Sequence, residues 1–286
     1  MGNQIAIVTG SSSGFGLLTS LELANRGFRV IATMRNPQKG TELTKKAKEL
    51  GIDRNIEIHE LDVTSEASIQ GLKRLLESLG QVDVLVNNAG YAGAGFVEEI
   101  PVNEYRKQFE TNLFGLIAVT QVVLPLMREQ GNGNIINISS ISGRIGFPGM
   151  SPYVASKYAL EGWSECLRLE MKPFGIQVAL VEPGSYQTNI WTTGKQVTEK
   201  SQLENSPYYE TMRNIEGYLL KNESGYGDPQ EVASLIGEIS QQKETTLRHP
   251  VGKRVKLSIR LKNFLPWTTW EKITVKTLKS NSSKTE

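Results

Sequence analysis

The fold is decided by residues 4–24, which read QIAIVTGSSSGFGLLTSLELA. The stretch IAIVT is apolar and rich in β-branched residues, which is typical of a buried strand. The glycine-rich loop GSSSGFG follows directly, and apolar residues then recur at helical spacing. A strand, a glycine loop and a helix in this order predict an anion site, because the helix N-terminus presents unpaired N–H groups to a pyrophosphate. The glycines let the backbone turn tightly and approach the ligand without a Cβ in the way.

The spacing of these glycines is G-x-x-x-G-x-G, which differs from the usual dinucleotide fingerprint G-x-G-x-x-G. The loop alone is therefore a weak signal, and its position directly after the first strand strengthens it. The loop residues that we predict to contact a dinucleotide are Gly10, Ser12, Ser13, Gly14, Phe15 and Gly16.

The end of the second predicted strand, 28–33, indicates which nicotinamide cofactor fits. A site that prefers NAD usually has Asp or Glu there to bind the ribose 2′-hydroxyl. This chain instead has Arg35 and no acid in TMRN, residues 33–36. A guanidinium binds a 2′-phosphate well and Ser12 could add a hydroxyl donor, so NADP(H) is predicted to be preferred over NAD(H). The alternative is that Arg35 is a solvated surface residue.

Strand and helix signals alternate along the chain, which predicts a parallel sheet with helices on both faces. We therefore expect an α/β fold of the Rossmann type, with a doubly wound parallel sheet of about seven strands in a single domain. The predicted strands lie near 4–9, 28–33, 55–60, 82–86, 133–138, 176–181 and 246–251, and the predicted helices near 14–26, 37–50, 65–79, 102–130, 152–172 and 228–240.

A second group of polar residues lies in the middle of the chain, in SPYVASK. Ser151 is a good N-cap and Pro152 suits the first helical position, so a helix should begin here. Tyr153 and Lys157 then share one helix face, four residues apart. A nearby ammonium lowers the pKa of a phenol, which would let Tyr153 exchange a proton near neutral pH.

Ser140 stands thirteen residues before Tyr153, at the end of the apolar run NIINI. That run reads as a buried parallel strand, and open α/β sheets carry their sites at the carboxyl ends of such strands. The Ser140 hydroxyl could therefore hydrogen-bond a substrate oxygen. Taken alone, these residues more often form an ordinary helix face and an ordinary turn, and the glycine loop at the start of the chain changes that interpretation.

With these motifs in this order, the chain resembles the short-chain dehydrogenase/reductase family, in its compact single-domain branch. The likeness covers roughly residues 3 to 250. The matching segments are TGSSSGFG from residue 9, LDVT from 61, NNAG from 87, NLFG from 112, Ser140, YVASK from 153, and PG at 183–184 with Thr188. A weaker likeness, in ATMR from 32 and RHPVG from 248, points to steroid and retinol dehydrogenase-like members.

The resemblance implies a role for each catalytic residue. Tyr153 would be the general acid in carbonyl reduction and the general base in alcohol oxidation. Lys157 would lower the pKa of Tyr153 and bind the nicotinamide ribose, while Ser140 would polarise the substrate carbonyl. Asn112 would hold a water that links Lys157 to solvent. Hydride passes directly between the nicotinamide and the carbon, so no metal is expected.

The resemblance also implies further cofactor contacts. They are Asp62 in the adenine pocket, Val63, Asn88, Ala89, Gly90, Tyr153, Lys157, Pro183, Gly184, and Thr188 at the nicotinamide carboxamide. The residues by themselves leave two alternatives open. Asp62 could be a helix N-cap, and Asn87 with Asn88 could form a simple turn.

Composition excludes several other classes of protein. The 286 residues suit one α/β domain, and a net charge of +2 gives no reason to expect a nucleic-acid partner. Two His and one Cys argue against a His/Cys metal site, a Ser-His-Asp hydrolase and a disulfide framework. Cys166 is expected to be a packed small residue. The uncharged run 111–127 reads as a core helix, and no signal peptide is visible, so a cytoplasmic protein is predicted.

Residues 189–227 break the alternation of strands and helices and are predicted to form a substrate lid within a domain spanning 1–252. Aromatic and apolar residues there and on two other loops suit a hydrophobic alcohol or carbonyl substrate. They are Trp191, Tyr208, Tyr209, Met212, Tyr218, Phe96, Phe147 and Met150. The alternative is that these side chains only pack the lid onto the core.

Residues 253–286 are predicted to form a basic amphipathic extension. From residue 248 onward the chain carries ten Lys or Arg and two Glu, interleaved with apolar residues. The extension either touches a membrane surface or lipid substrate, or packs on its own domain or on a partner subunit; the second interpretation is favoured. The resemblance implies a homodimer or homotetramer through helices 102–130 and 152–172.

Two other functions fit part of the pattern. Epimerases and dehydratases on this scaffold also use Tyr-x-x-x-Lys, but they usually have a larger carboxy-terminal substrate domain than this chain allows. A cofactor-binding regulator or sensor without turnover tends to lose Tyr or Lys, and both are present here.

Overall fold

The computed structural model describes residues 4–188, 194–221 and 225–279. Within these residues, the centre is a seven-stranded parallel sheet in the order β3-β2-β1-β4-β6-β7-β9. The strands are β1 (Ile5–Thr9), β2 (Arg29–Met34), β3 (Ile56–Glu60), β4 (Val84–Asn87), β6 (Gly133–Ile138), β7 (Ile176–Pro183) and β9 (Arg248–Val251). The predicted fold class, a doubly wound Rossmann-type sheet, is confirmed.

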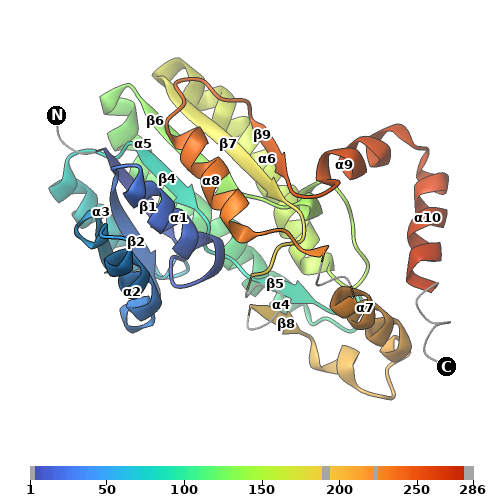
Figure 1. Ribbon diagram of the computed structural model, residues 1–286. Coiled ribbons are helices and arrows are strands. Elements are labelled where there is room, and N and C mark those ends of the chain that lie inside the picture. The colour runs from blue at the N-terminus through green and yellow to red at the C-terminus, as the bar shows by residue number, and fades with distance from the viewer. Residues whose placement is uncertain (1–3, 189–193, 222–224, 280–286) are drawn as a thin grey trace.

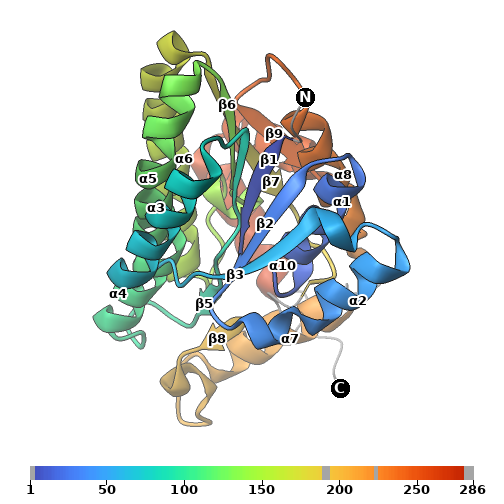
Figure 2. The same cartoon turned by 90° about the vertical axis from the view of Figure 1, so that its left-hand side faces the viewer.

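Helices cover both faces of this sheet (Figures 1 and 2). One face carries α1 (Gly14–Asn25), α2 (Thr41–Glu49) and α8 (Pro229–Ser240). The opposite face carries α3 (Glu66–Leu79), α5 (Gly115–Gln130) and α6 (Ser151–Met171). The strands are apolar on both sides because each side is buried beneath helices.

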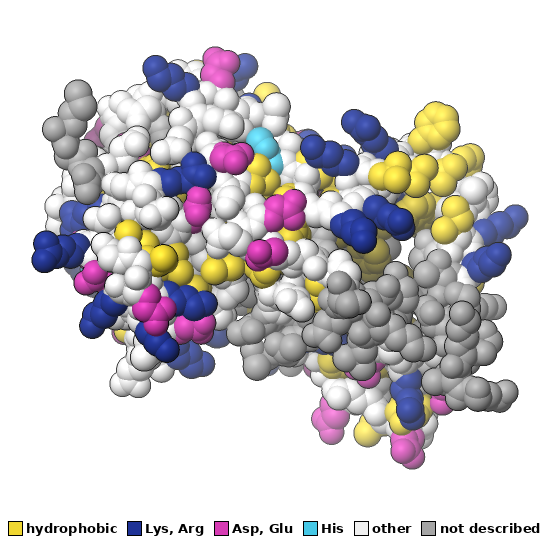
Figure 3. Space-filling model, in the orientation of Figure 1, with side chains coloured by type: hydrophobic (Ala, Val, Ile, Leu, Met, Phe, Trp, Pro, Cys, Tyr) yellow, Lys and Arg dark blue, Asp and Glu magenta, His cyan; other side chains and the backbone are white. Residues whose placement is uncertain are grey.

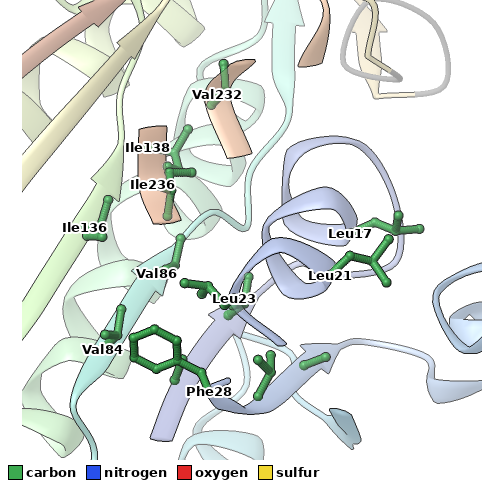
Figure 4. Packing of buried hydrophobic residues seen from close by; sticks show 14 of the residues in the cluster. Leu17, Leu21, Leu23, Phe28, Val84, Val86, Ile136, Ile138, Val232 and Ile236 are labelled. Carbon is green, nitrogen blue, oxygen red and sulfur yellow. The ribbon is translucent and has the colours of Figure 1, made fainter. Parts of the chain in front are cut away.

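The core beneath α1 and α8 shows how the strand and helix patterns meet (Figure 4). Leu23 and Phe28 pack toward Val84 on β4, while Val232 and Ile236 of α8 lie over the neighbouring strands. Apolar residues that recur every three or four positions form one stripe on each helix, and that stripe is what the sheet buries. This packing fixes α1 against the carboxyl end of β1.

The strand order reverses between β1 and β4, and this reversal positions the functional site. β1 continues into the glycine loop, β4 into Asn88, β6 into Ser140, and β7 into Gly184. All four strands run parallel, so these residues meet at one edge of the sheet. Open α/β sheets bind ligands in the crevice at such a reversal.

Two helix predictions need correction. The helix of Tyr153 begins at Ser151, with Met150 as its N-cap, so Ser151 is not the cap. The Ser151 hydroxyl instead pairs with the Tyr105 hydroxyl at 2.6 Å. The predicted helix 102–130 is present as α4 (Val102–Phe109) and α5, joined by a π-helical turn, Glu110–Phe114.

The helix Val102–Gln130 is long and apolar enough to cross a membrane by length and composition alone. However, Val119, Val123 and Met127 on α5 are fully buried against the sheet. The helix therefore packs as a core helix. Cys166, by contrast, is exposed, so the expectation that it is packed was wrong.

Several elements were not predicted. A small sheet pairs β5 (Ala92–Ala94) with β8 (Lys195–Val197), and the lid region contains α7 (Tyr209–Lys221). The chain continues past β9 into α9 (Val255–Phe264) and α10 (Trp267–Lys279). Trp191, named above as a lid residue, lies outside the described residues.

Candidate active site

A cavity of about 960 Å³ lies at the carboxyl edge of the sheet. It brings together nearly every residue predicted from the sequence. Those that line it are Gly10, Ser12, Ser13, Gly14, Phe15, Arg35, Asp62, Val63, Asn88, Ala89, Gly90, Ser140, Tyr153, Lys157, Pro183, Gly184 and Thr188. Gly16 and Asn112 do not line it, and their contributions are indirect.

The glycine loop is packed so closely that side chains cannot fit. Gly10 has a φ of +71°, and a Cβ there would stand 2.9 Å from the Cα of Ala89. A Cβ on Gly16 would stand 2.3 Å from the carbonyl oxygen of Gly10. Gly16 is thus required by the packing of the loop, which explains its place in the motif although it does not face the cavity.

Asn88 ties the glycine loop to the end of β4. Its side-chain amide donates to the carbonyl oxygens of Thr9 (2.8 Å) and Gly10 (3.1 Å). In return, the Thr9 hydroxyl accepts from the backbone N–H groups of Asn88 and Ala89 at 2.9 and 3.0 Å. These hydrogen bonds hold the glycine loop and the end of β4 together on two sides of the cavity. Asn87 and Asn88 therefore do more than form a simple turn, which was the alternative.

The N-terminus of α1 is available to an anion. Ser13 occupies the N-cap position, but its side chain makes no capping hydrogen bond. The first-turn N–H groups of a helix have no partner within the helix. They face the same cavity as the loop, so a diphosphate would supply the acceptors that the cap omits.

Gly16 provides a test of this loop. We expect Gly16→Ala to lower the free energy of unfolding by about 1–3 kcal/mol, because the new methyl group overlaps the Gly10 carbonyl. Binding of NADPH should weaken as well, since the loop must shift. Urea unfolding and fluorescence titration measure the two effects.

Gly162 is the matched control for that variant. It lies inside α6, and a Cβ there would meet nothing within 4 Å. Gly162→Ala should raise stability by up to about 1 kcal/mol, because Ala is the better helix former. Equal effects of the two substitutions would contradict the packing argument.

The adenosine end of the cavity is basic. Arg35 and Lys39 both line it, and within the described part of the chain neither side chain makes a hydrogen bond or salt bridge to a protein group. Lys39 was missed by the sequence analysis; it lies on a 3-10 turn, Pro37–Gly40, that brings it back beside Arg35. The sequence did contain a sign of this residue, because Lys39 is a second cation about one helical turn after Arg35.

Asp62 does not cap the following helix. Its carboxylate accepts from the N–H and hydroxyl of Thr64 at 2.9 and 2.8 Å, while Ser65 is the N-cap of α3. The N-cap alternative is therefore wrong. The carboxylate forms an Asx turn that holds the loop after β3 against the cavity.

Tyr153, Ser140 and Lys157 converge at the other end of the cavity. All three are buried, and the Lys157 ammonium donates to the Ile138 carbonyl oxygen at 2.7 Å. The Lys157 Nζ lies 5.7 Å from the centre of the Tyr153 ring. Burial raises the pKa of Tyr153 to about 12, and an interaction with the Ser140 hydroxyl partly opposes the shift.

The direction of that shift differs from the expectation that Lys157 lowers the pKa of Tyr153. Desolvation of the phenolate is the larger effect here, because Tyr153 is buried and the ammonium is turned to a backbone carbonyl. Burial also lowers the pKa of Lys157 to about 8, against the opposing charge of Glu161. Tyr153 thus holds its proton at neutral pH, as a proton donor must.

Asn112 lies in the π-helical turn Glu110–Phe114 and is not part of the cavity lining. Its side chain accepts from the Tyr91 N–H at 3.1 Å and donates to the Tyr91 carbonyl oxygen at 3.0 Å. It also reaches the Ser156 hydroxyl, at 3.3 Å, on the helix of Tyr153. π-Helical turns are frequent at functional sites because they reorient one side chain. Asn112 links the α4–α5 junction to α6.

At the end of the cavity where the nicotinamide is expected, one side-chain hydroxyl is free to donate and accept hydrogen bonds. The Thr188 hydroxyl is buried and has no hydrogen-bond partner among the residues that the structure describes. A Cβ on Gly14 would lie 3.7 Å from the Thr188 Cβ, so the lid side and the glycine loop approach closely here. A buried polar atom without a partner is costly. The Thr188 hydroxyl therefore fits a ligand group such as a carboxamide.

Tyr186 was missed by the sequence analysis although it stands only two residues after Gly184 of the Pro-Gly motif. Its hydroxyl donates to Glu231 at 2.7 Å, and its ring meets Phe15 edge-on at 5.6 Å. A Cβ on Gly227 would overlap the ring at 2.4 Å. Tyr186 therefore anchors the segment that carries Thr188.

A network of charged side chains connects the strands that lead into Ser140 and Gly184. Glu182, at the end of β7, pairs with Arg144 at 3.0 Å and with Arg248 at 3.5 Å. Arg248 also pairs with Glu161 at 2.9 Å, and Glu161 accepts from the Ser139 hydroxyl at 2.5 Å. These pairs join β6, β7, α6 and β9 beside Ser140.

Comparison with known proteins identifies the arrangement. Residues 4–198, more than half of the chain, match the protein family described as short chain dehydrogenase. The chain belongs to the short-chain dehydrogenase family. It is therefore an NAD(P)-dependent oxidoreductase of this family, and its relatives are named oxidoreductases and dehydrogenases.

Relatives align along almost the whole chain. Uncharacterized oxidoreductase YusZ of Bacillus subtilis (strain 168) is 48% identical over 279 residues, covering 97% of this chain and 99% of the relative. The 3-ketodihydrosphingosine reductase of Bacteroides thetaiotaomicron is 36% identical over 265 residues, covering 92% and 93%. A crystal structure of actinorhodin polyketide ketoreductase with NADPH has a TM-score of 0.73 at 30% identity, covering 88% of this chain and 97% of that one.

In this short-chain dehydrogenase, part of the segment predicted to form a lid is hydrogen-bonded to the rest of the domain. Glu99 accepts from the hydroxyls of Ser201 and Ser206, each at 2.6 Å. β8 pairs with β5, so the segment after Gly194 returns to the mouth of the cavity. The described part of the lid is held by these polar contacts.

The predicted substrate rim needs revision. The rings of Phe96 and Tyr208 stack on one another at 4.2 Å, and Met212 is buried. These side chains pack the lid, as the alternative stated, and none of them lines the cavity. Phe147 and Met150 remain partly exposed on the loop that α7 approaches: a Cβ on Gly149 would lie 3.3 Å from Ile215.

Proposed function

We propose that this chain is an NADP(H)-dependent oxidoreductase that transfers hydride between the nicotinamide and a hydrophobic alcohol or carbonyl, with Tyr153 as the general acid and base. The observation that carries the proposal is that one cavity joins the uncapped α1 N-terminus to Tyr153, Ser140 and Lys157. A dinucleotide site and a proton-transfer site thus share one space.

The residues of the chain divide the chemistry. Bound NADP(H) supplies or accepts the hydride. Tyr153 donates its phenolic proton to the carbonyl oxygen in reduction and takes it back in oxidation. The Ser140 hydroxyl donates a hydrogen bond to the same oxygen, and Lys157 places a positive charge beside the phenol. Buried walls exclude water, which strengthens these electrostatic effects.

The proposed preference for NADP(H) rests on the two cations at the adenosine end. Arg35 and Lys39 both face the cavity, and no Asp or Glu stands at the end of β2 to bind a ribose 2′-hydroxyl. A guanidinium and an ammonium together suit a phosphate dianion. The relative crystallised with NADPH supports this assignment.

The proposed substrate class rests on three apolar side chains outside the lining of the cavity, on the loop after Ser140 and on α7. Phe147, Met150 and Ile215 present apolar surface between the loop after Ser140 and α7. The relative named 3-ketodihydrosphingosine reductase has a keto compound in its name. We expect turnover with NADPH when hydrophobic ketones, aldehydes and quinones are screened by nicotinamide absorbance. Cofactor binding without turnover across that panel would favour the sensor alternative.

The stability of the protein should report the buried amine of Lys157. Its pKa falls from the ordinary 10.5 to about 8, so the unfolded chain binds more protons between these values. The cost of burying the charge is present below about pH 8 and is relieved as pH rises, so stability increases in this window. Relative to Lys157→Met, the free energy of unfolding of the wild type should rise by about 1 kcal/mol or more from pH 8 to pH 10.

Urea unfolding of the two proteins at several pH values measures that difference. Tyr153 acts in the opposite direction, because its raised pKa favours the folded state until pH exceeds its ordinary value of 10. The window below pH 10 therefore isolates Lys157. A difference that does not change with pH would show that the amine is not desolvated.

We also propose a homo-oligomer, with the cytoplasm as its compartment. Exposed apolar side chains on the α5–α6 side support an interface there, namely Phe114, Tyr158, Leu169 and Phe174. Sedimentation of the wild type and of Leu169→Glu tests this proposal. Equal monomer masses at all concentrations would contradict it.

A further inference from the structure

α9 and the start of α10 expose large apolar side chains. The exposed fractions are 54% for Leu257, 43% for Leu261, 87% for Phe264 and 63% for Trp267. We refer to these four residues as the carboxy-terminal apolar surface. Figure 3 shows hydrophobic side chains gathered over α9 and α10, with Lys and Arg around them.

α9 is apolar on two opposite sides, which is unusual for a helix at the surface of a domain. Val255 and Ile259 are buried and pack with Ile145 on the loop after Ser140. Leu257 and Leu261 are each two residues further along, which places them on the other side of the helix. Packing on the domain thus accounts for one apolar side and leaves the other without a protein partner in the described chain.

The charge around this surface is strongly positive. Residues 253–276 contain seven Lys or Arg and one acid, Glu271, for a net charge of +6. The whole chain has +2, so the remainder carries −4. Lys262 lies over the ring of Trp267, 5.1 Å from its centre, which joins one of the cations to the apolar surface.

We propose that α9 and α10 dock on the surface of an anionic lipid bilayer. Leu, Phe and Trp on one side with Lys and Arg at the flanks is the composition of helices that lie in the membrane interface. The cations would gain from anionic headgroups, while the apolar side chains would enter the acyl boundary. A second copy of this surface is disfavoured as the occupant, because two patches of the same positive charge repel.

Docking here would bring the loop that carries Phe147 and Met150, which we propose to contact the substrate, near the membrane. α10 contacts α7, and Trp270 packs against the cluster formed by Ile145, Val255 and Ile259, beside the loop that carries Phe147. Figure 1 shows α9 and α10 on the same end of the molecule as α7. This step of the inference rests on the proposed function. The placement would let a hydrophobic substrate pass from the bilayer toward the cavity without crossing water.

Vesicle cosedimentation tests the docking directly, without substrate or turnover. The full chain should bind vesicles of phosphatidylcholine mixed with phosphatidylglycerol and bind pure phosphatidylcholine much more weakly, with binding falling as salt rises. The double variant Phe264→Glu/Trp267→Glu should weaken binding about tenfold or more. Leu50→Glu is the control, because Leu50 is an exposed apolar residue (60%) at the end of α2, away from this surface.

A charge variant separates headgroup attraction from apolar insertion. Lys256→Glu/Arg260→Glu should remove the preference for phosphatidylglycerol, whereas Lys48→Glu/Lys73→Glu, with the same change in net charge, should keep it. Equal binding by wild type and Phe264→Glu/Trp267→Glu would overturn the proposal. So would a concentration-dependent dimer that this variant abolishes in sedimentation, because the surface would then be a contact between copies. Turnover is measured separately, so failure of the proposed activity leaves this result readable.

Discussion

Replacing Tyr153 with Phe should lower kcat/KM for carbonyl reduction by about 10²–10⁴-fold, the range of a general acid held in place. The substitution keeps the buried ring and removes only the hydroxyl, the group that carries the proton. Because the ring position is retained, NADPH affinity should change little. Nicotinamide absorbance gives the rate, and fluorescence titration gives the affinity.

Tyr158→Phe is the matched control for that prediction. Tyr158 lies on the same helix, but its side chain is 44% exposed and does not line the cavity. Removing the Tyr158 hydroxyl should leave kcat/KM near the wild-type value. If Tyr153→Phe retained most of its activity while remaining folded, another group would be the proton donor. Loss of cofactor binding in this variant would point instead to a structural role of the hydroxyl.

Removing the two adenosine-end cations should change the cofactor preference. Arg35→Ala/Lys39→Ala should reduce the ratio of kcat/KM with NADPH to that with NADH by about 10- to 100-fold, since hydrogen bonds to charged groups are worth about 1.5–3 kcal/mol. The loss should appear mainly as a raised KM for NADPH, because the 2′-phosphate is bound equally in the ground and transition states. Rates with NADH should stay similar.

Arg54→Ala controls for a general loss of positive charge. Arg54 is an exposed cation on the same half of the sheet, and it does not line the cavity. Its substitution should leave the cofactor ratio unchanged. A wild-type enzyme that already prefers NADH would contradict the argument from Arg35 and leave the proton-transfer mechanism standing. Single variants would divide the effect between Arg35 and Lys39.

Local chemistry made much of the site readable from the sequence. Gly10 acts through its own backbone geometry, and Tyr153 stands one helical turn before Lys157. Asn88 is different, because its hydrogen bonds reach Thr9 and Gly10 at the start of the chain, and only the resemblance pointed to it. A glycine with a positive φ, or a Tyr one turn from a Lys, leaves a signature in a few consecutive residues. The alternation of strands and helices likewise predicted the seven strands, because a buried parallel strand has a distinctive apolar run.

Contacts between distant segments could not be read in the same way. Tyr186 is held by Glu231 and enclosed by Gly227, and Arg248 reaches Glu161 from the last strand of the sheet. Nothing in the spacing of these residues shows that they meet. The aromatic lid residues were assigned to the substrate from composition, whereas Phe96 in fact stacks on Tyr208.

The sequence by itself determined the doubly wound sheet and the glycine loop, and it singled out Tyr153, Ser140 and Lys157 as candidates for proton transfer, because periodicity and short motifs report local backbone and side-chain chemistry. Only the tertiary structure shows how burial shifts the pKa values of these side chains. Burial, which depends on the whole fold, raises the pKa of Tyr153 where proximity to Lys157 alone predicted the reverse. It also decided which apolar side of α9 is buried and which remains exposed, since both sides look alike in the sequence.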